Sequence, residues 1–250
     1  MQQPSILARP NGATIAYHHN SGKEPGVLFC GGFHSDMTGI KATTLDAHCR
    51  EQGQQFTRFD YQGHGASSGQ FEDGTIGLWR DDMLAVFDEV TDGPQIVVGS
   101  SMGGWMALLL TFLRAERVAG LVLIAPAPDF TTELMWKSLP EEARRQIERD
   151  GIWLRPSIYG DGPYPITRNL IKESHNHLVL SRPVPFTGPV RILLGLQDEA
   201  IPIDHIICTA ETIKSDDIEI TLIKDGDHRL SRPADLDKIR AAVDELSRKF

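Results

Sequence analysis

The chain has 250 residues, of which 40% are hydrophobic and 24% are charged, and its formal net charge at pH 7 is −9. This length suits one domain with a modest insertion, and the composition excludes a disordered or fibrous chain. Because the negative charge repels phosphate backbones and anionic lipid headgroups, we expect no nucleic-acid partner.

The cysteines and the N-terminal residues bear on the cellular location. Cys30, Cys49 and Cys208 are odd in number and widely spaced, which favours a reducing compartment. The first residues have neither the basic start and apolar run of an export signal nor an Arg- and Ser-rich transit pattern. The longest apolar run, around residues 105–113, is far shorter than the roughly 20 residues of a membrane span. We therefore expect a soluble, cytoplasmic protein without an integral membrane segment.

Short apolar runs alternate with longer runs of helical periodicity, which is typical of a mostly parallel sheet with helices on both faces. Residues 13–18 alternate in polarity and are expected to form an antiparallel edge strand. The predicted buried strands are 26–30, 56–60, 95–99, 118–124, 190–194 and 218–223. The predicted helices are 43–51, 76–90, 102–114, 205–213 and 234–248.

This alternation is interrupted from residue 126 to residue 188, between two of the predicted strands. The interval holds two helical stretches among prolines, glycines and aromatic residues, and the chain must leave the sheet there and return to it. We therefore predict a core of residues 1–125 and 189–250 with a small helical cap, 126–188, inserted before the strand 190–194. Trp136 and Trp153 of this interval could shape an apolar pocket or fill the cap's own small core.

A Gly-x-Ser-x-Gly sequence, Gly99-Ser100-Ser101-Met102-Gly103, joins the predicted strand 95–99 to the following helix. A serine in so tight a turn has a strained backbone, and its neighbours two positions away crowd each other unless they are glycines. The turn presents the Ser101 hydroxyl at the edge of the sheet, where the helix N-terminus and the Met102 N–H stabilise developing negative charge. We predict that Ser101 is an acyl-transfer nucleophile and that Ser100 only forms part of the turn.

A serine hydroxyl is a weak nucleophile, so a histidine must take its proton and a carboxylate must hold that histidine. In α/β-hydrolases, which carry this turn, the chain order is Ser, acid, His. Of the nine histidines, only His228 lies between the last predicted strand and the last helix, and we predict it as the general base. His175 and His177 form a pair without a third ligand nearby, so we predict no metal and no other cofactor.

Two aspartates compete for the role of the acid. Asp198 follows the predicted strand 190–194, in a loop at the carboxyl end of the sheet, and is the preferred choice. Asp129 follows the strand 118–124, and a carboxylate there could also reach the histidine. Asp225 and Asp227 flank His228 and are expected to shape its loop.

The second oxyanion donor should come from the loop after an early strand. The sequence Cys30-Gly31-Gly32-Phe33-His34 follows such a strand, and its two glycines allow the backbone to approach a substrate. We predict the Phe33 N–H as this donor, beside that of Met102, with Gly32 as the alternative. Cys30 is expected to be buried at a strand end and not to act as a nucleophile.

Together these residues resemble the α/β-hydrolase superfamily over essentially the whole chain. Several segments resemble the mitochondrial α/β-hydrolase-domain group of palmitoyl-protein thioesterases and acyl-glucuronide esterases: Arg58-Phe59-Asp60-Tyr61-x-Gly63-x-Gly65, Trp79-Arg80-x-Asp82, 93–105, Asp227-His228-Arg229 and Gly151-x-Trp153-x-x-Pro156-Ser157-x-Tyr159. The resemblance implies an α/β-hydrolase fold with a small cap and a triad of Ser101, Asp198 and His228. Residues 30–33 depart from the Pro-Gly-aromatic pattern of that group, and no organelle presequence is visible, which favours a bacterial-type cytoplasmic version.

The residues and the resemblance predict a serine hydrolase that cleaves carboxylic esters or thioesters through an acyl-enzyme on Ser101. The expected substrates are small molecules or acylated proteins, and an S-acyl thioesterase of the palmitoyl type belongs to this class. An acyltransferase or a carbon–carbon bond hydrolase could use the same three residues. A ligand-binding pseudoenzyme is a further alternative, against which an intact triad argues.

Overall fold

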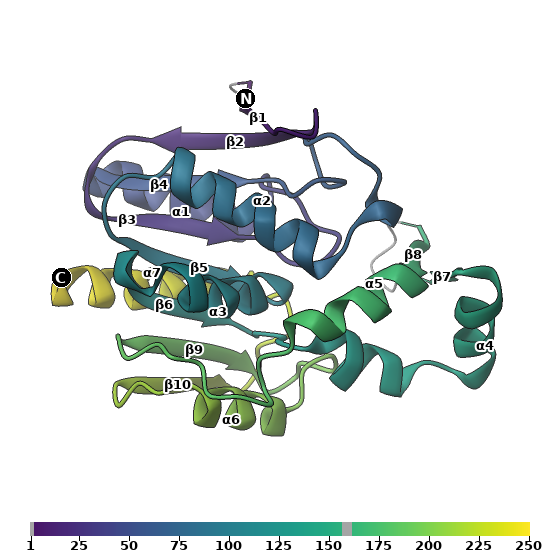
Figure 1. Ribbon diagram of the computed structural model, residues 1–250. Helices are drawn as coiled ribbons and strands as arrows, with labels where there is room; N and C mark the ends of the chain where they lie inside the picture. The colour runs from purple at the N-terminus through teal and green to yellow at the C-terminus, as the bar shows by residue number, and fades with distance from the viewer. Residues whose placement is uncertain (1–2, 157–161) are drawn as a thin grey trace.

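A mostly parallel eight-stranded sheet forms the centre of the computed structural model, which describes residues 3–156 and 162–250 (Figure 1). The strands lie in the order β1-β2-β4-β3-β5-β6-β9-β10. From β4 to β10 they run parallel, whereas β2 pairs antiparallel with both β4 and β1. Their bounds are β1 (Ser5–Ala8), β2 (Thr14–Asn20), β3 (Lys23–Cys30), β4 (Gln54–Phe59), β5 (Gln95–Ser100), β6 (Val118–Ile124), β9 (Val190–Gly195) and β10 (Ile218–Ile223).

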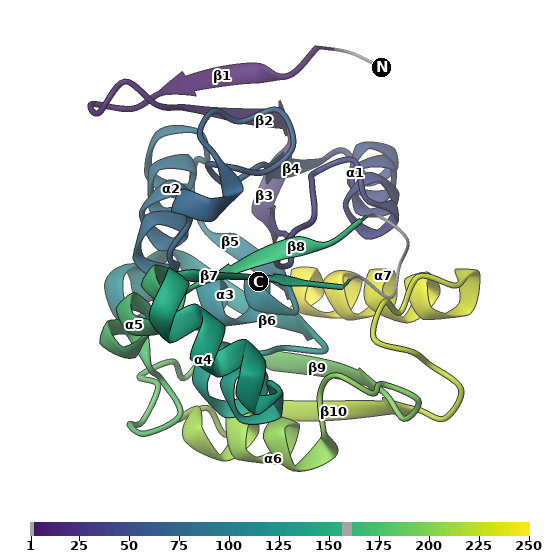
Figure 2. The ribbon, with the colours of Figure 1, turned by 90° about the vertical axis from the view of Figure 1, so that its right-hand side faces the viewer.

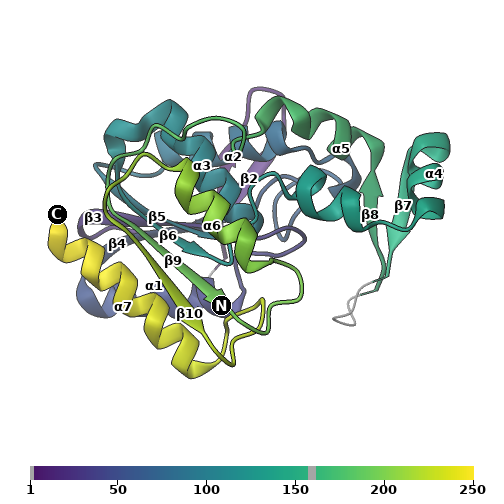
Figure 3. The ribbon, with the colours of Figure 1, turned by 90° about the horizontal axis from the view of Figure 1, so that it is seen from below.

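Helices cover both faces of this sheet. The helices α2, α3 and α6 lie on one face, and α1 and α7 lie on the other (Figures 2 and 3). Their bounds are α1 (Ile40–Gln52), α2 (Ile76–Glu89), α3 (Met102–Arg114), α6 (Ile203–Thr212) and α7 (Pro233–Lys249), with short 3₁₀ turns at η1 (Phe71–Asp73) and η2 (Ala115–Arg117). Within the described ranges, no helix has both the length and the apolar character needed to cross a membrane.

Alternation along β5 explains why both faces of the sheet are covered. Ile96 and Val98 belong to the core cluster that includes Val243 of α7, whereas Val97 belongs to the cluster that includes Trp105 of α3. Successive side chains of a strand point to opposite faces, so an unbroken apolar run requires helices on both sides. This arrangement confirms the predicted α/β architecture.

One predicted feature of the sheet is wrong. Residues 13–18 were expected at its edge, but β2 is an inner strand, because β1 pairs with it from outside, from Ser5 opposite Tyr17 to Ala8 opposite Thr14. β1 has only four residues, which is too few to show an alternation of polar and apolar side chains.

Between β6 and β9 the chain leaves the sheet. It forms, in order, the π-helical turn η3 (Thr131–Trp136), α4 (Glu141–Asp150), β7 (Ile152–Arg155), β8 (Tyr164–Thr167), α5 (Arg168–Ser174) and the turn η4 (His175–His177). β7 and β8 pair antiparallel and cross in front of the carboxyl ends of the central strands (Figure 2). The sequence predicted the helices of this interval but not the hairpin. Ser157 and Tyr159, which belong to the resemblance, lie outside the described residues.

Candidate active site

Ser101 occupies a strained turn between β5 and α3. Its φ is 54° and its ψ is −117°, a conformation that residues other than glycine rarely adopt. The Ser101 N–H donates to the carbonyl oxygen of Ile124 at 2.9 Å, so the end of β6 holds the turn. A side chain on Gly99 would collide with the carbonyl of Gly103, and one on Gly103 would collide with that of Cys30. The two glycines are therefore a steric requirement of this turn.

Three of the predicted side chains form a continuous chain of hydrogen bonds. His228 Nε2 lies 3.2 Å from Ser101 Oγ, and His228 Nδ1 lies 2.8 Å from Asp198 Oδ2. An ionised carboxylate can only accept, so Nδ1 donates to Asp198, and Nε2 of the neutral ring accepts from the serine hydroxyl. The side chain of Asp198 is fully buried, whereas 23% of the His228 side chain is exposed. This geometry suits transfer of the serine proton to His228.

The loops after β9 and β10 meet and so bring Asp198 to His228. A side chain on Gly195 would collide with the Gly226 carbonyl, which shows how closely the two loops approach each other. Asp198 Oδ1 accepts the N–H groups of Ala200 and Ile201 at 2.8 and 2.9 Å. These bonds fix the carboxylate and leave Oδ2 to His228.

Asp129, the competing acid, has other partners. Its carboxylate accepts the N–H groups of Val179 and Leu180, each at 2.9 Å. Burial raises the pKa of Asp129, and these backbone hydrogen bonds oppose the rise. Asp129 thus holds the chain that returns toward β9, and its hydrogen bonds go to that backbone rather than to His228.

The loop after β3 (residues 31–34), here called the oxyanion loop after the donor predicted in it, passes over Ser101. A Cβ added to Gly32 would lie 3.4 Å from the Cβ of Ser101. Phe33 comes next in the chain, and Met102 begins α3. Among the hydrogen bonds of the described residues, none uses the Phe33 or the Met102 N–H as donor. The loop that carries Phe33 lies against Ser101, as the predicted role of Phe33 requires.

Aromatic rings surround the Phe33 side chain. The centroids of the rings nearest to Phe33 lie 5.0 to 5.9 Å away and belong to Phe71, Trp79, Phe130 and Tyr164. The contacts with Phe71, Trp79 and Tyr164 are edge-to-face, and such contacts fix the orientation of a ring. The side chain of Phe33 is consequently fixed, and an aromatic cluster lies next to the loop that passes over Ser101.

His64, which the sequence analysis did not select, lies against the oxyanion loop. Its Nε2 accepts the backbone N–H of His34 at 3.2 Å, and its Nδ1 lies 3.3 Å from the carbonyl oxygen of Gln62. An amide N–H can only donate, so the proton of the neutral ring is on Nδ1. Burial lowers the pKa of His64 to about 4. The residue was set aside because it precedes Ser101, yet it stands between the glycines of the segment 63–65 that carries part of the resemblance.

A buried neutral His64 is expected to make the fold sensitive to acid. The pKa of His64 falls from 6.5, the ordinary value, to about 4 in the folded chain. Between these two pH values the unfolded chain therefore binds a proton that the folded chain does not bind. Its contribution to stability is present above pH 6.5 and is lost as the pH falls toward 4. Between about pH 7 and about pH 5 this one residue should cost about 2 kcal/mol of unfolding free energy.

Urea unfolding of the wild type and of His64→Gln across this pH range measures the effect. All other titrating groups are common to both proteins, so the difference in slope belongs to His64. We expect the wild type to lose about 2 kcal/mol more than the variant between about pH 7 and about pH 5. Parallel curves would show that His64 is not held neutral in the fold.

Cys30 and His177, two other reactive or metal-binding side chains, have surroundings of a different kind. Cys30 is buried at the end of β3, and burial raises the pKa of its thiol to about 12, so it carries no thiolate at neutral pH. His177 is bonded to Glu173 at 2.5 Å. Within residues 3–156 and 162–250, no three His, Cys, Asp or Glu side chains are grouped so that they could hold a metal ion.

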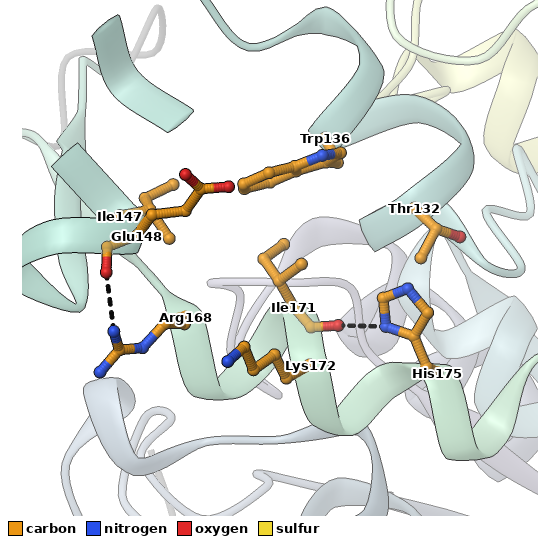
Figure 4. A pocket seen from close by; sticks show the side chains of 8 residues that line it. All are labelled: Thr132, Trp136, Ile147, Glu148, Arg168, Ile171, Lys172 and His175. Atoms are coloured by element: carbon orange, nitrogen blue, oxygen red, sulfur yellow. Dashed lines mark hydrogen bonds between the residues drawn. The ribbon is translucent and has the colours of Figure 1, made fainter. Parts of the chain in front are cut away.

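A cavity of about 470 Å³ is walled by η3, α4, α5 and η4 (Figure 4). Its lining residues are Thr132, Trp136, Ile147, Glu148, Arg168, Ile171, Lys172 and His175. All of them come from the interval between β6 and β9, and Ser101, Asp198 and His228 are not among them. Trp136 therefore faces this cavity, whereas Trp153, in β7, packs half-buried against the core.

The amino-acid sequence matches a hydrolase family model and is similar to named mammalian proteins. Residues 23–157 match the family model Hydrolase_4, described as "Serine aminopeptidase, S33". The chain is 40% identical over 247 residues to the mouse "Palmitoyl-protein thioesterase ABHD10, mitochondrial", with 98% of this chain and 83% of the mouse protein covered. The human protein of the same name is 38% identical, and the match covers 98% of this chain and 80% of that protein.

Solved structures agree with these relationships. The structure of mouse α/β-hydrolase domain-containing protein 10 has a TM-score of 0.91 at 40% identity, and the match covers 99% of both chains. A putative hydrolase from Agrobacterium vitis S4 has a TM-score of 0.92 at 38% identity, with 98% of each chain covered. The similarity therefore extends over the sheet and over the interval between β6 and β9.

The predicted cytoplasmic location is wrong. Both the mouse and the human relatives are named as mitochondrial, and this points to mitochondria rather than to the cytoplasm. The prediction depended on the pattern of the first residues and on the three widely spaced cysteines, and such cysteines indicate a reducing compartment without identifying which one.

The comparisons confirm the predicted fold and the predicted hydrolase class, because the similarity covers nearly the whole chain at 38 to 40% identity. The chain belongs to the α/β-hydrolase family of ABHD10, and it is a hydrolase of the ester and thioester class.

Proposed function

We propose that the chain is a serine hydrolase with a catalytic triad of Ser101, His228 and Asp198. The observation that carries the proposal is the unbroken hydrogen-bond chain from Ser101 Oγ through both ring nitrogens of His228 to Asp198 Oδ2. These are the three groups that activated-serine chemistry requires, in the order that the chemistry requires.

In the proposed mechanism, His228 Nε2 takes the proton of Ser101 as Oγ attacks the acyl carbonyl carbon. Asp198 stabilises the imidazolium that forms, and the N–H groups of Phe33 and Met102 donate to the oxyanion. His228 then protonates the leaving alcohol or thiol as the acyl-enzyme forms. In the second half of the cycle it takes a proton from the water that attacks the acyl-enzyme. It then returns this proton to Ser101 Oγ as the carboxylic acid is released.

We further propose that residues 126–188 act as a cap over the core formed by residues 1–125 and 189–250. Tyr164 of the β7–β8 hairpin supports this role, because its ring lies 5.9 Å from that of Phe33 and 5.3 Å from that of His34. The hairpin is therefore in contact with the oxyanion loop. A cap in this position excludes water from the acyl group and narrows access to Ser101.

For the substrate we propose acyl thioesters with a long apolar chain. Two observations support this class. The curated relatives are named palmitoyl-protein thioesterases. In addition, the rings of Phe33, Phe71 and Phe130 form an aromatic cluster next to Gly32, which lies over Ser101. An apolar cluster in this place suits a hydrocarbon chain better than a polar acyl group.

A panel of matched thioesters and oxygen esters, with saturated acyl chains of about four to about sixteen carbons, tests this substrate class. We expect kcat/KM to rise roughly fourfold for each methylene that becomes buried, until the acyl site is full. At equal chain length, the thioester should be cleaved faster than the oxygen ester. The background rate of each compound is measured with Ser101→Ala. An enzyme that prefers short chains, or that cleaves the oxygen esters as fast as the thioesters, would contradict the proposed substrate.

A further inference from the structure

We propose that His64 is a positioning residue, which holds the oxyanion loop in the shape that stabilises the transition state. This inference rests on the proposed serine-hydrolase function, in which the Phe33 N–H is an oxyanion donor. His64 contacts the loop one residue beyond that donor, at the backbone N–H of His34. The residue acts through the loop and does not contact the reacting atoms.

The oxyanion loop needs a restraint from outside. It begins with two glycines, which have the widest backbone freedom of all residues. It continues to His34, whose φ of 56° is unfavourable for a residue with a side chain. An oxyanion donor lowers the barrier only when it already points at the place where charge develops. Within the loop, Ser35 bonds back to the Gly32 carbonyl through its N–H and its hydroxyl. The strained backbone at His34, between Phe33 and Ser35, still needs a group from outside the loop to hold it.

His64 supplies that restraint with the only atom of its ring that can accept. Nε2 lies 3.2 Å from the His34 nitrogen, and Nδ1 donates to the Gln62 carbonyl, so the tautomer is defined at both ends. The ring is 4% exposed and lies among the rings of Tyr61, Phe71 and Trp79. A buried, neutral imidazole is a rigid acceptor that water cannot replace.

A second layer of hydrogen bonds supports the partner of His64. Asp82 of α2 accepts both the backbone N–H of Gln62 at 2.8 Å and its side-chain amide at 2.6 Å. The indole N–H of Trp79 donates to the same Gln62 carbonyl that receives Nδ1–H, at 3.0 Å. A connected set of hydrogen bonds thus runs from α2 to the oxyanion loop. It is formed by the segments 58–65 and 79–82, on which part of the family resemblance rests.

The other side of the loop is held by the hairpin between β6 and β9. The His34 ring stacks on Tyr164 of β8, with centroids 5.3 Å apart and an angle of 29° between the planes. His34 is thus held through its backbone by His64 and through its side chain by Tyr164. The two contacts explain how a non-glycine residue keeps a positive φ at this position.

The proposal predicts a change in kcat rather than in KM. The hydrogen bond from the Phe33 N–H strengthens as the carbonyl oxygen becomes an oxyanion, whereas the bound substrate depends on it little. Replacing His64 by phenylalanine keeps the ring and removes the acceptor. We expect His64→Phe to lower kcat about tenfold to a hundredfold and to leave KM within about threefold. The binding of a boronic acid that forms a tetrahedral adduct on Ser101 should weaken in parallel with kcat.

A conservative variant separates positioning from packing. In His64→Gln the side-chain oxygen reaches about as far as Nε2 and can accept the His34 N–H, so we expect this variant to recover at least a tenth of the wild-type kcat and to exceed His64→Phe. His19→Phe removes another partly buried histidine, on β2, and should leave kcat unchanged. Urea unfolding of each variant identifies the folded fraction. If His64→Phe does not fold, His64→Leu replaces it in the comparison with His64→Gln.

Three results would overturn the inference. They are a full kcat in His64→Phe, an equal loss of kcat in the Phe and Gln variants, and a rise in KM at constant kcat. The proposed serine mechanism fails on a different observation, namely that Ser101→Ala still turns over substrate. A serine-dependent enzyme with an unaffected His64→Phe variant would therefore reject only the role of His64.

Discussion

Replacing Ser101 by alanine is expected to lower kcat by a factor on the order of 10⁴ to 10⁶ and to abolish labelling by a fluorophosphonate. The hydroxyl is the only atom of this residue that can attack an acyl carbon, and it lies 3.2 Å from the ring nitrogen that would take its proton. A residual rate over the uncatalysed reaction should remain, because the backbone donors and the substrate site are unchanged. The measurement is the turnover of an acyl thioester together with gel detection of the labelled protein.

Ser100→Ala is the matched control for this experiment. Ser100 is the neighbouring residue and carries the same functional group, but it is the last residue of β5 and is only 7% exposed. We expect this variant to keep wild-type labelling and turnover within about threefold. If Ser101→Ala were labelled at the wild-type rate, the nucleophile would be a different residue and the proposed triad would be wrong.

The sequence was sufficient to predict those parts of the candidate site that depend on local chemistry and chain order. The turn around Ser101 is recognisable because only glycine fits at positions 99 and 103, and this requirement leaves a fixed spacing in the sequence. His228 could be predicted because one histidine alone lies between the last strand and the last helix. In both cases a backbone requirement acts over a few residues, so the pattern is visible without the fold.

Contacts between distant segments could not be predicted in the same way. The bond between His64 and His34 joins two loops that are 30 residues apart, and the stacking of Tyr164 on His34 brings in the hairpin between β6 and β9. Neither contact leaves a periodic pattern. The hairpin escaped prediction because its strands have four residues each, fewer than a reliable alternation requires.

The choice between the two candidate acids also needed the fold. Asp198 and Asp129 both follow predicted strands, so chain order alone left the choice open. The structure separates them by their partners: one oxygen of Asp198 faces His228, whereas Asp129 accepts the amides of residues 179–180. We therefore expect replacement by asparagine to have different consequences at the two positions.

Asp198→Asn is expected to lower kcat about 10⁴-fold while the protein remains folded. The amide oxygen of the new side chain can still accept the N–H groups of Ala200 and Ile201, which now bond to Oδ1. The amide nitrogen would then face His228 Nδ1 and donate to it. This forces the ring proton onto Nε2, where the ring can no longer accept the proton of Ser101.

Asp129→Asn should lower the stability of the fold and leave kcat nearly unchanged. An asparagine has one acceptor oxygen for the two amides of Val179 and Leu180, and its NH₂ group is left against a backbone donor. We expect a loss of about 1 to 3 kcal/mol in unfolding free energy, with kcat of the folded fraction within a few-fold of the wild type. Steady-state kinetics and urea unfolding on both variants distinguish the two roles. A severe loss of kcat in a fully folded Asp129→Asn, with Asp198→Asn nearly as active as the wild type, would transfer the role of the acid to Asp129.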